Sequence, residues 1–171
     1  AYRIEFGFDG VENITDYLKC KNVFSIGGSW MINDDFESVT KISKESVKTL
    51  HGFIFSHLGI NSQDKEEAST ISATLELFGF NRSEKDFCWE NKSTIQFPFF
   101  EVLKATDSGQ NGKIGIKTWN VERAINYLKR FNINPNMATA SYFDEKNHSD
   151  IKSVFLDKSI GGFSIEISNR I

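Results

Sequence analysis

Four side chains that can do chemistry occupy equivalent positions in two halves of the chain. The sequence His-Leu-Gly-Ile that starts at His57 aligns with Lys-Ile-Gly-Ile that starts at Lys113, an offset of 56 residues. Glu101 and Glu166 lie between apolar neighbours in two later segments, at an offset of 65. Imidazole and carboxylate groups are ligands for divalent metals, and an ammonium is a counter-charge for carboxylates. These four residues are therefore the first candidates for a functional site.

The same alignment extends over a strand and a helix in each half, which indicates an internal repeat. Each copy begins with a short apolar run, followed by a residue suited to cap a helix, Asp64 or Asn120. Apolar residues then recur three and four positions apart, which predicts a helix with one packed face. They are Ala68, Ile71, Leu75 and Phe78 in the first copy, and Val121, Ala124, Leu128 and Phe131 in the second.

After each helix the apolar pattern becomes alternating, which is typical of strands. The predicted strands are Phe87–Trp89 and Ser93–Leu103 in the first copy, and Ala138–Phe143, Ile151–Leu156 and Phe163–Ser168 in the second. Each copy is thus expected to have the order strand, helix and three strands. A four-stranded unit cannot bury its apolar face alone, so the two copies must pack or pair. The sequence predicts an α+β domain built from two βαβββ modules.

The N-terminal third follows a different pattern. A helix is expected at residues 11–19, a short buried strand at 23–26 and an amphipathic helix at 34–50. Because one strand between two helices has no sheet of its own, this segment is expected to dock on the duplicated domain or on another chain.

Composition excludes several classes of function. The 171 residues carry a formal net charge of -3, with basic residues scattered among acidic ones, so no nucleic-acid partner is expected. No apolar stretch approaches the roughly 18 residues that a membrane span needs, and no secretory signal is evident. Cys20 and Cys88 are far apart and are expected to be free thiols, which favours a cytoplasmic location. Nucleophile-elbow, P-loop, dinucleotide and zinc-protease motifs are not found.

Residues 11–31 resemble the last helix and strand of the barrel in keto-deoxy-phosphogluconate / keto-hydroxyglutarate aldolases. The resemblance rests on Val11–Lys19 and on the string Gly-Gly-Ser-Trp-Met at Gly27–Met31. In that family the Gly-Gly-Ser turn helps to hold a substrate phosphate, so Gly27, Gly28 and Ser29 would bind phosphate only within a complete barrel. Such a barrel needs roughly 200 residues, so this chain alone is not expected to be a competent aldolase.

Residues from Phe53 onward resemble the glyoxalase-like (vicinal oxygen chelate) domain fused behind such aldolases in some bacteria. The matching strings are F-S-H-L-G-I, E-V-L-K, G-K-I-G-I-K-T, V-E-R-A-I-N-Y-L and S-I-G-G-F-S-I-E-I. The resemblance implies the glyoxalase/bleomycin-resistance/dioxygenase-like fold and three parts: a barrel remnant at 1–33, a linker helix at 34–51 and a glyoxalase-like domain at 52–171, with modules 52–105 and 112–171. It also implies that His57, Glu101, Lys113 and Glu166 are the metal-ligand positions, facing a shared cavity.

Two interpretations of that set remain open. His57, Glu101 and Glu166 are an acceptable set for zinc, nickel, manganese or iron, with Lys113 turned away. Alternatively, Lys113 replaces the metal and bridges the two glutamates, because two buried carboxylates need one cation or the other. A third option is that His57 is simply a hydrogen-bonded histidine of a strand and that the two glutamates are solvated.

Three functional hypotheses follow from the resemblance. The first is an accessory domain of a keto-acid aldolase that binds a small oxo-acid or supports assembly. The second is a metal-dependent glyoxalase- or dioxygenase-type enzyme. The third is a non-catalytic module for homo-oligomerisation, with the predicted helix at 34–50 and the barrel remnant as its surface.

Overall fold

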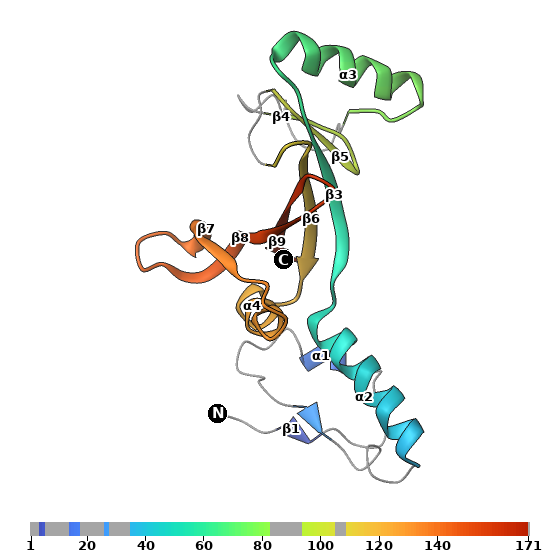
Figure 1. Cartoon of the computed structure of the whole chain (residues 1–171), viewed down its shortest axis with the longest axis vertical. Coiled ribbons are helices and arrows are strands. Elements are labelled where there is room, and N and C mark those ends of the chain that lie inside the picture. Colours follow the sequence, from blue (N-terminus) through green and yellow to red (C-terminus); the bar gives the residue numbers. More distant parts are fainter. Residues whose placement is uncertain are drawn as a thin grey trace.

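The computed structural model describes residues 4–5, 14–17, 26–27, 35–82, 94–104 and 109–170 (Figure 1). The elements are β1 (Ile4–Glu5), α1 (Ile14–Tyr17), β2 (Ile26–Gly27), α2 (Phe36–His51), β3 (Ile54–Asn61), α3 (Lys65–Leu77), β4 (Thr94–Gln96), β5 (Phe100–Leu103), β6 (Gly112–Thr118), α4 (Val121–Lys129), β7 (Pro135–Asp144), β8 (Ser149–Ile160) and β9 (Phe163–Asn169). The predicted α+β class is confirmed.

A seven-stranded mixed sheet is the centre of the fold. Its strand order is β4-β5-β3-β6-β9-β8-β7. The two middle strands, β3 and β6, are antiparallel, and each has a parallel neighbour on its outer side, β5 and β9 respectively. The strands that begin the two sequence repeats are therefore paired at the middle of the sheet, and each is flanked by the last strand of its own half.

The two halves differ in the strands that the structure describes. The second half has the full order strand, helix and three strands, from β6 to β9. The first half has β3, α3, β4 and β5, and the strand predicted at Phe87–Trp89 lies outside the described residues.

Side-chain caps begin the three longer helices, at Asp64 and Asn120 as the sequence predicts, and at Asp35 for α2, where no cap was predicted. Asp35 accepts hydrogen bonds from the backbone N–H groups of Glu37 and Ser38 at the start of α2. Asp64 and Asn120 do the same at α3 and α4. These bonds satisfy N–H groups that have no partner within the helix, which stabilises each start by about 1 kcal/mol.

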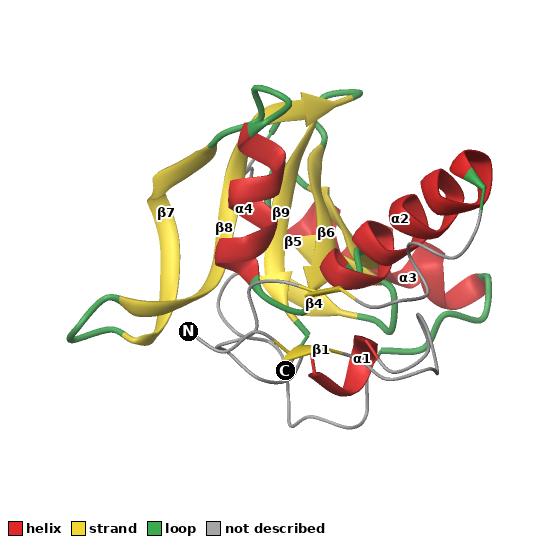
Figure 2. Cartoon of the chain, turned by 90° about the horizontal axis from the view of Figure 1, so that it is seen from below, coloured by secondary structure: helices red, strands yellow, loops and turns green. Residues whose placement is uncertain are grey.

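The helices of the two repeats, α3 and α4, cover the same face of the sheet. Helix α4 packs on β8 and β9 through a cluster that includes Val121, Ile165 and Ile167 (Figure 2). Helix α3 packs on β4 and β5 through a second cluster, which includes Ala68 and Val102. Because side chains alternate along a strand, the residues between these core positions face the opposite side of the sheet. None of the described helices packs there, and we call this side the helix-free face.

Helix α2 leads directly into β3 (Figure 1). Its last carbonyl groups are held by the second half of the domain. Thr118 Oγ1 donates to the His51 carbonyl at 2.5 Å, and Arg123 Nη1 donates to the Leu50 carbonyl at 3.3 Å. Arg170 donates to the Gly52 carbonyl while its guanidinium lies over the Trp119 ring. Gly52 itself has a left-handed φ of 55°, which ends the helix.

The stretch predicted as strand at Ser93–Leu103 contains two strands, β4 and β5. Two antiparallel strands occupy this stretch, with Thr94 paired to Leu103, and the chain reverses around Pro98. Proline has no N–H to donate to a ladder, which favours a turn at this point.

The prediction that Phe78 and Phe131 lie on the packed faces of the two helices is wrong. Helix α3 ends at Leu77 and α4 ends at Lys129. Phe78 and Phe131 follow these ends and are 77 % and 59 % exposed. The two helices therefore end one and two residues before the last apolar position of each pattern.

The N-terminal third contains a strand pair of which the sequence indicated one member. β2 overlaps the strand expected at 23–26 at Ile26, whereas β1 was not expected. β1 and β2 are parallel, with Ile4 opposite Ile26. A two-residue strand is too short to leave an alternating pattern, so β1 could not be recognised from the sequence.

Candidate functional site

The four residues selected from the sequence converge on the helix-free face of the sheet. Lys113 Nζ lies 2.9 Å from Glu101 Oε2 and 3.2 Å from Glu166 Oε2. The ammonium therefore contacts one oxygen of each carboxylate. We call His57, Glu101, Lys113 and Glu166 the charged cluster.

His57 completes the charged cluster from β3. Its Nε2 lies 3.3 Å from Glu101 Oε2 and 3.8 Å from Glu166 Oε2. Nε2 is buried and forms no aligned hydrogen bond with a described residue, and these approaches are ion pairs only when the imidazole is protonated. Nδ1 lies 3.2 Å from Ser56 Oγ, and the direction of that hydrogen bond depends on the imidazole tautomer.

Strand register explains why the four side chains meet. On one row across the sheet, Gly59 of β3 is opposite both Glu101 of β5 and Lys113 of β6. Two residues away, on the same face of the sheet, Gly115 of β6 is opposite both His57 of β3 and Glu166 of β9. Each row thus has a glycine in the middle and a cluster residue on either side.

The two glycines make room for the charged cluster. A Cβ atom at Gly59 would lie 2.5 Å from Lys113 Cγ, and one at Gly115 would overlap the His57 ring. Neither glycine is needed for an unusual backbone angle, because a left-handed φ is found at other glycines and not at these two. Their role is steric: they let side chains from non-adjacent strands lean over the strand between them.

The site holds its charges away from bulk water. The side chains of Lys113, Glu101 and Glu166 are 12 %, 10 % and 16 % exposed. Burial alone would raise the pKa of Glu101, but its contacts with His57 and Lys113 outweigh burial and lower that pKa to about 2. Burial would lower the pKa of Lys113, but the charges of Glu166 and Glu101 and their hydrogen bonds raise it. Both residues are therefore ionised at neutral pH.

Gln96 is a site residue that the sequence did not reveal. Its Nε2 donates to Glu101 Oε1 at 3.0 Å, and Gln96 is paired with Glu101 across β4 and β5. This amide occupies the carboxylate oxygen that His57 and Lys113 leave free. The residue could have been found only if the turn at Pro98 had been recognised, because that turn sets the register.

The charged cluster does not fit a divalent metal in this arrangement. In the described part of the chain, no group of three or more His, Cys, Asp and Glu side chains is placed to hold a metal ion. Lys113 Nζ contacts the two carboxylate oxygens that a metal would need. An ammonium has no lone pair and repels a cation at this range.

The proposed phosphate-binding turn is described only at its first residue. Gly27 is the second residue of β2 and is paired with Glu5. Gly28 and Ser29 lie outside the described residues, so that prediction stays a prediction.

None of the described helices is both long enough and apolar enough to cross a membrane. Comparisons of the chain with protein-family models, with curated proteins and with solved structures find no match.

Proposed function

We propose that this chain is a glyoxalase-like accessory domain of a keto-acid aldolase, in which Lys113 replaces the metal and the helix-free sheet face binds a small oxo-acid. The observation that carries the proposal is the position of Lys113 Nζ between Glu101 and Glu166, at 2.9 Å and 3.2 Å. The resemblance places a metal among these same four positions. A further support is the pairing of β3 with β6, which joins the two repeats as that fold requires.

The chemistry of an ammonium suits an oxo-acid oxygen. Lys113 has three N–H donors, and its two carboxylate contacts use two of them. The third can donate to a keto or carboxylate oxygen of a ligand. This is binding chemistry, and we assign no catalytic step to it.

The charge of the cluster sets a condition on anion binding. Two carboxylates outnumber one ammonium, so the cluster has a net negative charge while His57 is neutral. A proton on His57 cancels that charge. An oxo-acid anion is therefore expected to bind more tightly to a cluster that carries a protonated His57 than to one with a neutral His57.

The experiment is a calorimetric titration of the chain with pyruvate, repeated with Lys113→Gln and with Lys117→Gln as the matched control on the same strand. Saturable binding that Lys113→Gln abolishes and Lys117→Gln leaves unchanged supports the proposal. Absence of saturable binding by the wild-type chain at millimolar pyruvate, at both neutral and mildly acidic pH, would falsify it. For the aldolase relationship, the coding sequence upstream of Ala1 should encode a complete barrel.

Assembly is a second candidate function, and exposed apolar side chains at the end of α3 favour it. Leu77 and Phe78 are 87 % and 77 % exposed, and Phe80 follows them at 37 %. Adjacent large apolar side chains on a surface are typical of interfaces. We therefore expect a homo-oligomer that sedimentation would detect. The double substitution Leu77→Gln and Phe78→Ser should shift it toward monomer, and an unchanged sedimentation coefficient would count against this surface.

A further inference from the structure

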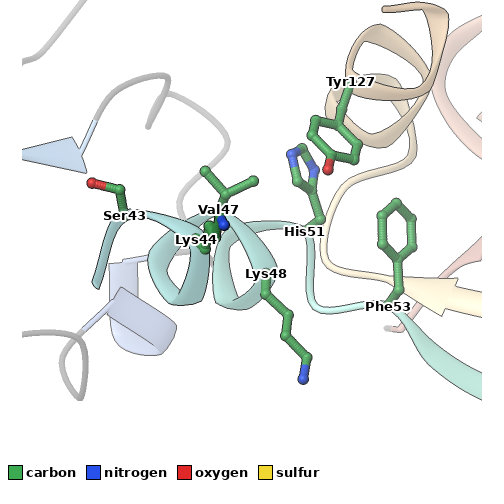
Figure 3. A pocket seen from close by; sticks show the side chains of 7 residues that line it. All are labelled: Ser43, Lys44, Val47, Lys48, His51, Phe53 and Tyr127. Atoms are coloured by element: carbon green, nitrogen blue, oxygen red, sulfur yellow. The ribbon is translucent and has the colours of Figure 1, made fainter. Parts of the chain in front are cut away.

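A pocket of about 440 Å³ lies beside the C-terminal half of α2, on residues outside the charged cluster (Figure 3). Lys44, Val47, Lys48 and His51 line it from α2, together with Phe53 and Tyr127. Its size falls within the range of small-molecule sites, roughly 300–1,000 Å³.

Aromatic rings form one wall of this pocket. His51 stacks on Phe53 with ring centres 5.6 Å apart, and its ring centre is 4.1 Å from that of Tyr127. Figure 3 shows Phe53 and Tyr127 on the side of His51 away from the lysines of α2. Such a wall is suited to stacking against a flat apolar ring.

The wall is held in place by the bonds that end α2. Thr118 and Arg123 bind the carbonyl groups of His51 and Leu50, at 2.5 Å and 3.3 Å. His51 is only 5 % exposed, so its ring is fixed by packing as well. A site with anchored walls loses little freedom when a ligand binds, which favours affinity.

The pocket has a neutral histidine in its wall and a positive surround. His51 Nδ1 is buried and has no hydrogen-bond partner among the described residues. Burial, with the charges of Arg123 and Arg130, lowers the pKa of His51 to about 4, so the imidazole is neutral at physiological pH. The charged residues that line the pocket are both cations, Lys44 and Lys48. Positive charge beside aromatic walls selects for an anion that carries a flat ring.

We propose that this pocket binds a small aromatic carboxylate, with its ring against Phe53 and Tyr127 and its carboxylate beside Lys44 and Lys48. The site is separate from the charged cluster and does not depend on the function proposed for it. The two sites share no residue, so one chain would have room for two different small acids.

The test is a fluorescence and calorimetric titration with naphthoate, with naphthalenemethanol as the neutral analogue of the same ring. Val47 is 40 % exposed on a helix, so Val47→Glu and Val47→Gln should both fold. Saturable one-to-one binding of naphthoate is expected, weakened about tenfold by Val47→Glu and much less by Val47→Gln, because only the former places a negative charge at the pocket. Circular dichroism of both variants checks the fold.

Three lysine variants locate the binding of naphthoate at this pocket. Lys48→Gln should weaken naphthoate binding severalfold, whereas Lys41→Gln, an exposed lysine on the same helix outside the pocket, should not. Lys113→Gln should leave naphthoate binding unchanged, which distinguishes this site from the charged cluster. The proposal is overturned if naphthoate shows no saturable binding, if naphthalenemethanol binds equally well, or if Val47→Glu and Lys48→Gln have no effect.

Discussion

Lys113 and Glu101 are on strands that are not neighbours, yet their charged atoms are 2.9 Å apart. Their strands, β6 and β5, lie on opposite sides of β3, about 9 to 10 Å apart by the usual strand spacing. The contact forms because β3 carries Gly59 at that level, so no side chain stands between them. Gly115 has the same relationship to His57 and Glu166. The charged cluster thus depends on two small residues as much as on its four functional ones.

The first prediction concerns Gly59. In Gly59→Ala the new methyl group would occupy the space of Lys113 Cγ, which is close to the backbone and cannot move freely. We expect a loss of about 1–3 kcal/mol in the free energy of unfolding, measured by urea denaturation. In a double-mutant cycle with Lys113→Ala most of that loss should disappear, because the overlapping atoms are gone. Fully additive effects would show that Gly59 acts in some other way.

Contact between the two halves was predictable because a four-stranded unit cannot bury its apolar face alone, whereas the choice between packing and pairing was left open. The repeat also made His57 and Lys113 recognisable as equivalent residues. Gly59 and Gly115 are identical residues at equivalent positions, separated by the same offset as His57 and Lys113. Glu101 and Glu166 were recognisable as inward-facing because each lies between core residues of its strand. The glutamates and their apolar neighbours form short alternating patterns, and such patterns can be recognised from a single sequence.

Other features were hidden because they depend on contacts distant in sequence. The pocket beside α2 needs the end of that helix to meet Tyr127, 76 positions after His51. The contact of Gln96 with Glu101 needs the turn at Pro98, which interrupts a stretch that otherwise reads as one strand. Phe78 and Phe131 continue the helical spacing by type, but the helices end before them.

The second prediction concerns acid stability. The pKa of Glu101 is lowered from its usual 4.5 to about 2 in the folded chain. A lowered pKa stabilises the fold at pH values above about 4.5, and this contribution is lost as the pH falls through about 2. It amounts to about 3 kcal/mol. In urea denaturation, Glu101→Gln should be less stable than the wild type at neutral pH and should approach it in stability toward the acid end. The exposed Glu45→Gln serves as control and should show no such convergence.

The third prediction concerns metal affinity. If the ammonium of Lys113 is what prevents metal binding, Lys113→His should create a site with His57, Glu101 and Glu166 around one ion. Calorimetry with zinc or nickel should then detect one ion per chain in Lys113→His and much weaker binding in the wild type. Adding His57→Ala to this variant should abolish the gain. Stoichiometric metal in the wild-type chain, lost on His57→Ala, would instead favour the metal-dependent enzyme.

The fourth prediction concerns the anchoring of α2. Thr118 is fully buried, and its hydroxyl group is 2.5 Å from the His51 carbonyl. Thr118→Val keeps the shape but removes that donor, which leaves the carbonyl with the 3.4 Å contact from Trp119 N–H. We expect a loss of about 1–3 kcal/mol. Hydrogen exchange should accelerate in the last turns of α2, because their attachment to the sheet is weaker, while the amides of α4 change much less.

Thr40→Val removes an exposed hydroxyl near the start of the same helix and is the matched control. Equal acceleration in both variants would mean that α2 is held by other contacts, with Arg123 and Arg170 as the next residues to test.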